Sequence, residues 1–329
     1  MPLDRFHREI DYLRISLTDH CNLRCVYCMP LGEVPYADRE EILTADEIES
    51  VVTAAAGVGF RRIRFTGGEP TLRPDLVEIV SRCSSVDGIN DVAMTTNGIL
   101  LPPLAEALRE AGLDRVNIHV DSLREDSLPK LMRRGTAAAI RAGIEAAVEA
   151  GFSPLKLNCV VTGGLNDTEV VDLALLTRDN DWHVRFIELM PLGGGECAEV
   201  SRSRFVSNVD TQARIETALG RLEALPRVNP ADESANYQAS GFRGVIGFIS
   251  PVSAPYCGTC NRMRLTSDGR FHLCLLHDDE LDVRRALRAG ANTEKIGEIL
   301  LHAVGAKPTG HALERGVEPL QRAMHHLGG

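Results

Sequence analysis

Short runs of β-branched and other apolar residues alternate with longer alanine- and leucine-rich stretches through the first 190 residues. Residues 11–18 (DYLRISLT) are typical of a strand, and residues 44–59 (TADEIESVVTAAAGVG) are typical of a helix. Thr44 and Glu47 form a capping-box pattern, in which the hydroxyl and the carboxylate each bind a free amide at the helix start. The pattern therefore predicts a strand followed by a capped helix.

The same alternation recurs along this region. Further predicted strands are RRIRFTGG, DVAMTTNG, RVNIHVDS, PLKLNCVV and HVRFIELM, with helical stretches between them. Six strands with helical crossovers indicate parallel strands with right-handed connections. We expect an open doubly wound sheet or an incomplete barrel. In either case the loops after the strands hold the chemistry.

The alternation of predicted strands and helices ends after Met190. A glycine-rich connector (PLGGGECAEVSRSRF) is followed by a predicted helix near 210–224, a polar stretch at 225–240 and short strands and turns at 244–276. Two more helices are expected at 283–290 and 293–305. We therefore divide the chain into a barrel, residues 1–195, and a C-terminal extension, residues 196–329.

Composition narrows the class of protein. The chain has 329 residues and 44% hydrophobic content, without an apolar run long enough to span a bilayer and without the apolar core of a signal peptide, so we expect a cytoplasmic protein. The net charge of −10 disfavours broad binding to nucleic acid or to anionic membranes. Nine cysteines, an odd number, favour metal ligation or catalysis over a disulfide framework.

Three cysteines lie directly after the first predicted strand. Cys21, Cys25 and Cys28 are spaced C-x3-C-x2-C, with Tyr27 before the last. Three thiolates suit a [4Fe–4S] cluster, in which each sulfur holds one iron and the fourth iron stays open for a ligand. The alternative is a zinc site completed by His20 or by a remote residue.

The segment CNLRCVYC resembles the radical S-adenosylmethionine (AdoMet) enzymes. The resemblance implies an incomplete (β/α)6 barrel whose three-cysteine [4Fe–4S] cluster binds AdoMet. The reduced cluster then cleaves AdoMet to methionine and a 5′-deoxyadenosyl radical, which the protein has to position.

The resemblance also implies an AdoMet site. The TGGEP segment resembles the family's glycine-rich motif, and Gly67 and Gly68 allow close backbone approach to a ligand. His119 stands where relatives commonly have a serine that contacts AdoMet. The residues implied for the cofactor are Tyr27, Gly67, Gly68, Glu69, His119 and Met190.

A second cysteine triad lies in the extension. Cys257, Cys260 and Cys274 are spaced C-x2-C-x13-C, again with three ligands and not four. The other cysteines are interpreted differently: Cys83 falls in a predicted helix and Cys159 in a predicted strand, where free cysteine is commonly a small buried residue. A second [4Fe–4S] cluster with an open iron is therefore expected.

The two triads, together with RFTGGEPTLR, RFIELMP, GFISPVS and a terminal Gly-Gly, resemble the GTP 3′,8-cyclase family of molybdenum cofactor biosynthesis over residues 5–329. That resemblance implies a lyase that converts GTP to 3′,8-cyclo-7,8-dihydro-GTP. It also implies a reduced flavodoxin- or ferredoxin-type electron donor and cyclic pyranopterin monophosphate synthase as the pathway partner. The oligomeric state stays open, with a homodimer as one option.

Cations interrupt several of the predicted strands. A cation within an apolar strand is costly to bury without a partner, and arginine forks match phosphate geometry, so these positions suit the roughly four negative charges of GTP. The resemblance implies that Arg14, Arg64, Thr95, Lys156, Asn158, Arg185, Arg262, Met263 and Arg264 bind GTP. It implies catalytic roles for Arg14, Arg262, Arg264, Gly328 and Gly329.

Two other interpretations are carried forward. A radical AdoMet enzyme with an auxiliary cluster could modify a peptide or another metabolite, but it has no particular need for Arg14, Arg64, Arg262 and Arg264 together. An electron-transfer or zinc-structured binding protein would favour closed four-ligand sites and gives no reason for the glycine motif. The iron and sulfide content separates the zinc interpretation from the other two.

Overall fold

The computed structural model describes residues 1–32 and 34–328. Its strands form one sheet in the order β12-β11-β10-β1-β2-β3-β4-β5-β6-β9-β8-β7, and the strands from β10 to β9 in that order run parallel. The predicted six-strand arrangement is confirmed as β1 (Tyr12–Ser16), β2 (Arg62–Thr66), β3 (Asp91–Thr96), β4 (Arg115–His119), β5 (Lys156–Val161) and β6 (His183–Glu188).

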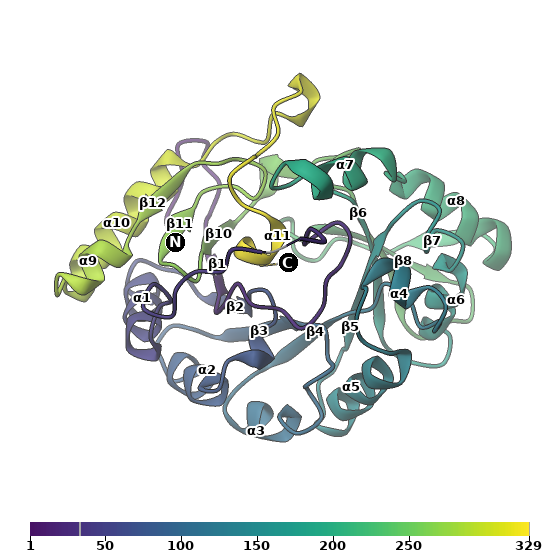
Figure 1. Ribbon diagram of the computed structural model, residues 1–329, viewed down its shortest axis with the longest axis horizontal. Helices are drawn as coiled ribbons and strands as arrows, with labels where there is room; N and C mark the ends of the chain where they lie inside the picture. Colours follow the sequence, from purple (N-terminus) through teal and green to yellow (C-terminus); the bar gives the residue numbers. More distant parts are fainter. Residues whose placement is uncertain (33, 329) are drawn as a thin grey trace.

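The helices lie around the outside of this curved sheet (Figure 1). Helix α1 begins after the Thr44–Glu47 capping box that the sequence predicts, and both of its reciprocal hydrogen bonds are present. The helices of the barrel are α1 (Ala45–Gly57), α2 (Leu76–Ser84), α3 (Ala105–Glu110), α4 (Leu128–Leu131), α5 (Ala137–Glu149) and α6 (Val170–Ala174), with 3-10 turns at η1 (Pro70–Leu72) and η2 (Leu175–Thr177).

Alternation along the strands separates the core from the barrel interior. In β1, Leu13 and Ile15 are fully buried in the hydrophobic core, whereas Arg14 between them lines an interior pocket. Side chains on a strand point to opposite faces in turn, so a cation flanked by apolar residues is directed inward.

The extension adds strands to both edges of the barrel sheet. Strand β9 (Val245–Ile249) pairs in parallel with β6, and β10 (Arg262–Leu265) pairs in parallel with β1. The remaining strands of the extension are antiparallel: β7 (Leu222–Ala224), β8 (Ser234–Ala239), β11 (Arg270–His272) and β12 (Glu280–Asp282). The extension therefore completes the walls of the barrel interior.

The helices of the extension differ from the sequence prediction in two places. The helix predicted near 210–224 is α8 (Asn208–Leu219); it ends before Gly220, which has a φ of 84°, and 222–224 become β7. The glycine-rich connector contains α7 (Gly195–Ser203), so Cys197 lies in a helix.

One strand also differs from the prediction. The predicted polar stretch contains β8, because pairing with β9 outweighs its weak local preference for a strand.

The C-terminal part of the chain returns to the barrel. Helices α9 (Arg284–Arg288) and α10 (Thr293–Ala306) agree with the prediction, and the chain continues through η4 (Leu313–Arg315) to the short α11 (Met324–Leu327). Figure 1 shows α11 in the middle of the ring formed by the strands. Within the described residues, no helix combines the length and apolar character needed to cross a membrane.

Candidate active site

A pocket inside the barrel is lined by both cysteine triads. All six thiols are free, and the pocket between them is walled by residues from β1, β2, β3, β5 and β10. The triads lie 229 or more positions apart in sequence, so only the sheet order brings them to one cavity. The two triads therefore face one cavity.

The loop after β1 carries the first triad and packs closely against the Gly67–Gly68 segment after β2. A Cβ atom at Gly67 would lie 2.5 Å from the Thr18 carbonyl oxygen, and one at Gly68 would lie 2.2 Å from the His20 carbonyl oxygen. Larger side chains therefore cannot fit here. The two glycines let the chain pass directly beside the triad, where both line the pocket.

Tyr27 and His119 belong to one hydrogen-bonded group. The Tyr27 hydroxyl donates to Asp121 Oδ2 at 2.6 Å and lies 2.9 Å from His119 Nε2, which is 3.0 Å from Asp121 Oδ2. Burial alone would lower the pKa of His119, but Asp121 raises that pKa well above its ordinary value. His119 therefore lies against a buried carboxylate that favours its protonated form and fixes its ring.

Glu69 lines the same end of the pocket and is fully engaged by protein donors. Its two carboxylate oxygens accept from the Thr71 amide and hydroxyl, the Thr96 hydroxyl and the Asn97 amide at 2.6–3.1 Å. Burial raises the pKa of Glu69, and these hydrogen bonds oppose that rise. Glu69 therefore ties the ends of β2 and β3 together beside the predicted AdoMet site.

The second triad lies at the start of β10 and after β11. Cys257 begins the turn η3 (Cys257–Thr259), Cys260 directly follows it, and Cys274 follows β11. Burial would raise the pKa of the Cys260 thiol, but Lys307 and Arg262 lower it to about 7. Arg8 donates to the carbonyl oxygen of Cys257 at 2.8 Å and so ties the N-terminal segment to this turn.

The predicted cations converge on the barrel interior because their strands pair in register. Arg14 pairs with Arg64 on one side and with Arg264 on the other, and Asn158 pairs with Arg185. Lys156 is half-buried. The arginines are all buried, with exposed fractions of 8% or less; they are Arg14, Arg64, Arg185, Arg262 and Arg264.

These predicted residues do not all reach the pocket wall. Arg185 lies behind Asn158 and donates to its Oδ1 at 2.9 Å. Lys156 lies close enough to Arg185 and Arg64 for their charges to act on it. Met263 differs from the rest, because its side chain is fully buried in the hydrophobic core on the opposite face of β10.

Several buried polar atoms in the interior have no hydrogen-bond partner within the described residues. They include the hydroxyls of Thr95, Tyr12 and Ser234 and the Nε atoms of Arg14, Arg64 and Arg262. A buried polar group without a partner is unfavourable, and native proteins rarely keep many together. Their concentration around one pocket indicates a site built for a polar, anionic ligand.

The C-terminal segment packs against the pocket wall beside the Gly67–Gly68 segment. A Cβ atom at Gly328 would lie 2.0 Å from Thr66 Oγ1 and 2.9 Å from the Gly67 nitrogen, so only glycine fits. Arg264 donates to the Gly328 carbonyl oxygen at 2.7 Å. Gly329, also predicted to be catalytic, lies outside the described residues.

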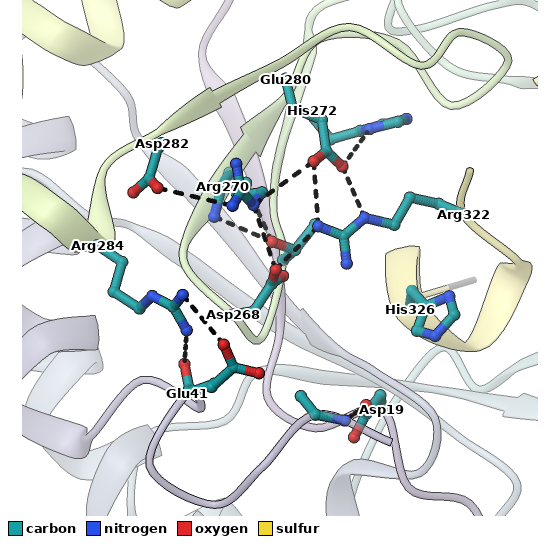
Figure 2. Close-up of polar contacts among 12 residues, drawn as sticks. Asp19, Glu41, Asp268, Arg270, His272, Glu280, Asp282, Arg284, Arg322 and His326 are labelled. Carbon is teal, nitrogen blue, oxygen red and sulfur yellow. Dashed lines mark hydrogen bonds and ion pairs between the residues drawn. The ribbon is translucent and has the colours of Figure 1, made fainter. Parts of the chain in front are cut away.

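An arginine network holds this segment in place. Figure 2 shows Arg322 reaching between Glu280 and Asp268, to which it donates at 2.8 and 2.9 Å. The Leu320 and Gln321 amides both donate to the Asp278 carboxylate at 3.0 Å. Three carboxylates of the extension therefore hold residues 320–322, which lead into α11.

The donors present fit iron–sulfur clusters and AdoMet. Each triad offers three free thiols with no disulfide among the described residues, and the glycines beside the first triad leave a cradle that a Cβ would fill. Three thiol ligands leave one iron of a [4Fe–4S] cluster open, and the adjacent backbone can approach a ligand on it.

Comparison with known proteins assigns the family. Residues 15–177 match the Radical SAM superfamily model, and residues 182–313 match the Molybdenum Cofactor Synthesis C model. The chain is 44% identical to the GTP 3′,8-cyclases of Moorella thermoacetica and Heliobacterium modesticaldum, over 99% of this chain and at least 99% of each relative. The chain belongs to the GTP 3′,8-cyclase family.

The fold of this GTP 3′,8-cyclase family member also resembles that of other radical AdoMet enzymes. The crystal structure of Streptococcus suis SuiB bound to S-adenosylmethionine superposes with a TM-score of 0.57 at 14% identity, over 88% of this chain and 68% of that one. At that identity the similarity concerns the fold alone, and it agrees with the predicted incomplete barrel.

The pocket also contains residues that sequence reasoning missed. Glu233 and Tyr256 line it beside Arg262, Lys307 lies near the second triad, and Asp121 fixes His119. Asp121 follows the end of β4, and that position alone could have singled it out. The others come from irregular segments, which carry no periodic signal.

Proposed function

We propose that this chain is a radical AdoMet GTP 3′,8-cyclase, which converts GTP to 3′,8-cyclo-7,8-dihydro-GTP in molybdenum cofactor biosynthesis. The observation that carries the proposal is the set of buried and half-buried cations between two cysteine triads, in a chain 44% identical to GTP 3′,8-cyclases over its whole length. A polyanion is the kind of ligand that would neutralise so many buried positive charges.

The first triad is the proposed ligand set of the [4Fe–4S] cluster that membership of the radical AdoMet superfamily implies. When bound, the reduced cluster and AdoMet together supply a primary carbon radical that abstracts hydrogen from a nearby C–H bond. Cys21, Cys25 and Cys28 hold the cluster, while the backbone at Gly67 and Gly68 passes close beside it.

The proposed AdoMet site is completed by other residues around the first triad. Tyr27, His119 and Met190 all line the pocket near this end, and Asp121 fixes the first two. The Tyr27 hydroxyl and the His119 ring are directed by one buried carboxylate, so little reorganisation is needed to meet a charged ligand.

The triphosphate of GTP is proposed to bind Arg64, Arg185 and Lys156. Within the described residues these three cations have no ion-pair partner, and Asn117, with its amide oxygen turned toward them, accepts from Arg64 and Arg185. Burial and the neighbouring cations lower the pKa of Lys156 to about 8 and that of Arg185 to about 10. A bound polyanion would relieve this repulsion, since opposite charge favours the charged forms.

Asn158 and Thr95 line the pocket beside these cations and are proposed to contact the nucleotide. Thr95 keeps an unpartnered hydroxyl, and Asn158 is held by Arg185. For Met263, which faces the core, only main-chain atoms are available for such a contact.

Cys257, Cys260 and Cys274 are proposed to hold a second [4Fe–4S] cluster, which would offer one iron without a thiol ligand for the substrate. Arg262 lies two residues after Cys260, so a nucleotide that spans from Arg64 to Arg262 also reaches this triad. Arg14 and Arg264 complete the wall, and α11 with Gly328 packs against that wall. Positioning of this kind is the main demand of radical chemistry, because the radical attacks whichever C–H bond is nearest.

Two partners belong to the proposal. A reduced flavodoxin- or ferredoxin-type protein would supply electrons, and cyclic pyranopterin monophosphate synthase would consume the product. Both are inferred from the family's reaction, and pull-down with each purified protein tests them.

The activity is tested by anaerobic incubation of reconstituted, dithionite-reduced protein with AdoMet and GTP. Mass spectrometry should find 5′-deoxyadenosine rising together with a cyclised GTP product, and replacement of Cys21 by alanine should abolish both. Deoxyadenosine without a GTP product would reassign the substrate to a peptide or another metabolite. Neither product from iron-replete protein would contradict radical chemistry altogether.

A further inference from the structure

Glu233 is a buried carboxylate among the cations of the pocket. It directly precedes β8, at the end of a segment (225–232) that is largely exposed, yet its own side chain is only 14% exposed and lines the pocket. Its neighbour Ser234 is buried, and the Ser234 hydroxyl has no hydrogen-bond partner within the described residues. The chain therefore turns inward at this point and places a negative charge inside an otherwise cationic site.

The Glu233 carboxylate bridges two of the predicted catalytic arginines. Arg14 Nη2 donates to both carboxylate oxygens, at 3.0 and 3.1 Å, and Arg262 Nη1 donates to Oε2. Arg262 also donates to the Ala231 carbonyl oxygen at 3.2 Å and lies over the Tyr256 ring. Burial would raise the pKa of Glu233, but Arg262 and Arg14 hold it well below its ordinary range, so the group stays ionised.

This bridge divides the cations of the pocket into two sets. Arg14 and Arg262 are paired with a carboxylate, whereas the cations in and around the pocket without an ion pair within the described residues include Arg64, Arg185, Arg264 and Lys156. Burial and neighbouring cations lower the pKa of these four groups, and Glu233 opposes that decrease at Arg64 and Arg185. Glu233 therefore neutralises Arg14 and Arg262 by direct ion pairs, whereas the neighbouring Arg64, Arg185 and Lys156 keep positive charge with no paired carboxylate within the described residues, and that charge attracts phosphate.

We infer that Glu233 determines the orientation of the nucleotide by keeping phosphate groups away from Arg14 and Arg262. This inference rests on the proposed function. A phosphate placed at those two arginines would have to displace the carboxylate or lie beside it, and like charges at close range are strongly unfavourable. The triphosphate is thereby left to Arg64, Arg185 and Lys156, and the base end faces the second triad. Glu233 acts through the arginines and is a positioning residue.

The test compares Glu233→Gln and Glu233→Ala with a control, Glu223→Gln, which removes an exposed carboxylate from the neighbouring strand β7. The probe is inorganic triphosphate, assayed as an inhibitor of GTP turnover by the cluster-loaded enzyme. Without Glu233, two more arginines are open to phosphate, so the inhibition constant should fall by about tenfold or more. The control should keep the wild-type inhibition constant.

Turnover gives a second measurement. Because GTP can then bind in a wrong orientation, the Glu233→Gln enzyme should lose about tenfold or more in kcat while the KM for GTP stays equal or falls. Glu233→Asp, which keeps the charge, should recover most of the wild-type kcat. A variant with unchanged inhibition by triphosphate, or with KM raised and kcat intact, would overturn the inference.

Thermal unfolding measures triphosphate binding even in variants that are only marginally stable. Inorganic triphosphate should raise the Tm of cluster-loaded Glu233→Gln or Glu233→Ala more than it raises the Tm of the wild type, because tighter binding to the folded state stabilises it more. Equal shifts would contradict the inference. This measurement does not depend on GTP turnover. If the wild type makes no cyclised product, the proposed function fails while the effect of Glu233 is still measured.

Discussion

Gly328 illustrates how a single residue determines the packing of the C-terminal segment against the barrel. It has a φ of 73°, and a Cβ there would overlap the Thr66 hydroxyl, so Gly328→Ala should displace the segment that Arg264 holds. A displacement of roughly 1 Å near reacting groups can cost about 100-fold in rate, and we expect a loss of that order in product formation.

Gly316 provides the matched control. It also has a φ of 73°, but nothing lies within 4 Å of a Cβ built there. Gly316→Ala should cost about 1–2 kcal/mol of stability from backbone strain and leave turnover unchanged. Equal losses of turnover in the two alanine variants would mean that backbone strain, and not the fit against Thr66, is responsible.

Lys156 gives the site a pH dependence. Burial, together with Arg185, Arg115 and Arg64, lowers its pKa to about 8, and a bound triphosphate favours its charged form. At pH 9 only about one tenth of the free protein carries this charge, so the Kd for GTP should rise about tenfold between pH 7 and pH 9. Isothermal titration calorimetry across this range measures the change.

Lys156→Arg tests whether that residue is responsible. A guanidinium stays charged throughout this range, so the variant should bind GTP with nearly constant affinity from pH 7 to pH 9. If the variant shows the same weakening at high pH as the wild type, another group carries the dependence.

At the scale of elements, the segment leading to α11 depends on carboxylates supplied by the β10–β12 region. Arg322 donates to Asp268 and Glu280, and these bonds lie between the body of the extension and the residues that enter the barrel (Figure 2). Arg322→Ala should therefore lower turnover by about tenfold or more through loss of positioning, with a smaller effect on global stability.

Hydrogen exchange of the C-terminal peptide measures this directly. Amides near α11, including the Gly328 amide that donates to Met324 at 2.9 Å, should exchange faster in Arg322→Ala than in the wild type. Arg315→Ala, an exposed position on the same segment, is the control and should exchange as the wild type does. Unchanged exchange in Arg322→Ala would show that other contacts hold the segment.

At the scale of the whole molecule, the two proposed clusters predict a defined iron content. Wild-type protein should hold about eight iron atoms per chain, four in each [4Fe–4S] cluster. Cys274→Ala should retain about four and still cleave AdoMet, but should lose the cyclised GTP product.

Cys83→Ala is the matched control for this measurement. Cys83 is a fully buried cysteine in α2 within the hydrophobic core, so its replacement should affect stability and leave the iron content unchanged. Tetrahedral zinc in place of iron in the wild type, or an unchanged iron content in Cys274→Ala, would rule out the second cluster at that triad.

Much of the barrel was predictable from local pattern. The six strands, the Thr44 cap and the burial of Cys83 and Cys159 follow from alternation, capping chemistry and the small apolar character of free cysteine. These signals are contained within a few neighbouring residues. Sequence analysis failed where a distant partner decides the outcome, as in β8, which exists because β9 lies beside it.

The sequence by itself determined the two cysteine triads, the glycine motif and the cations within apolar strands, because the spacing of thiols and a charge within an apolar run are local properties. The tertiary structure alone decided that Glu233 pairs with Arg14 and Arg262, that Met263 faces the core, and that Asp121 directs His119. Those contacts join residues brought together by the order of strands in the sheet and by the path of irregular segments. Long-range pairing of this kind depends on the packing of the whole chain.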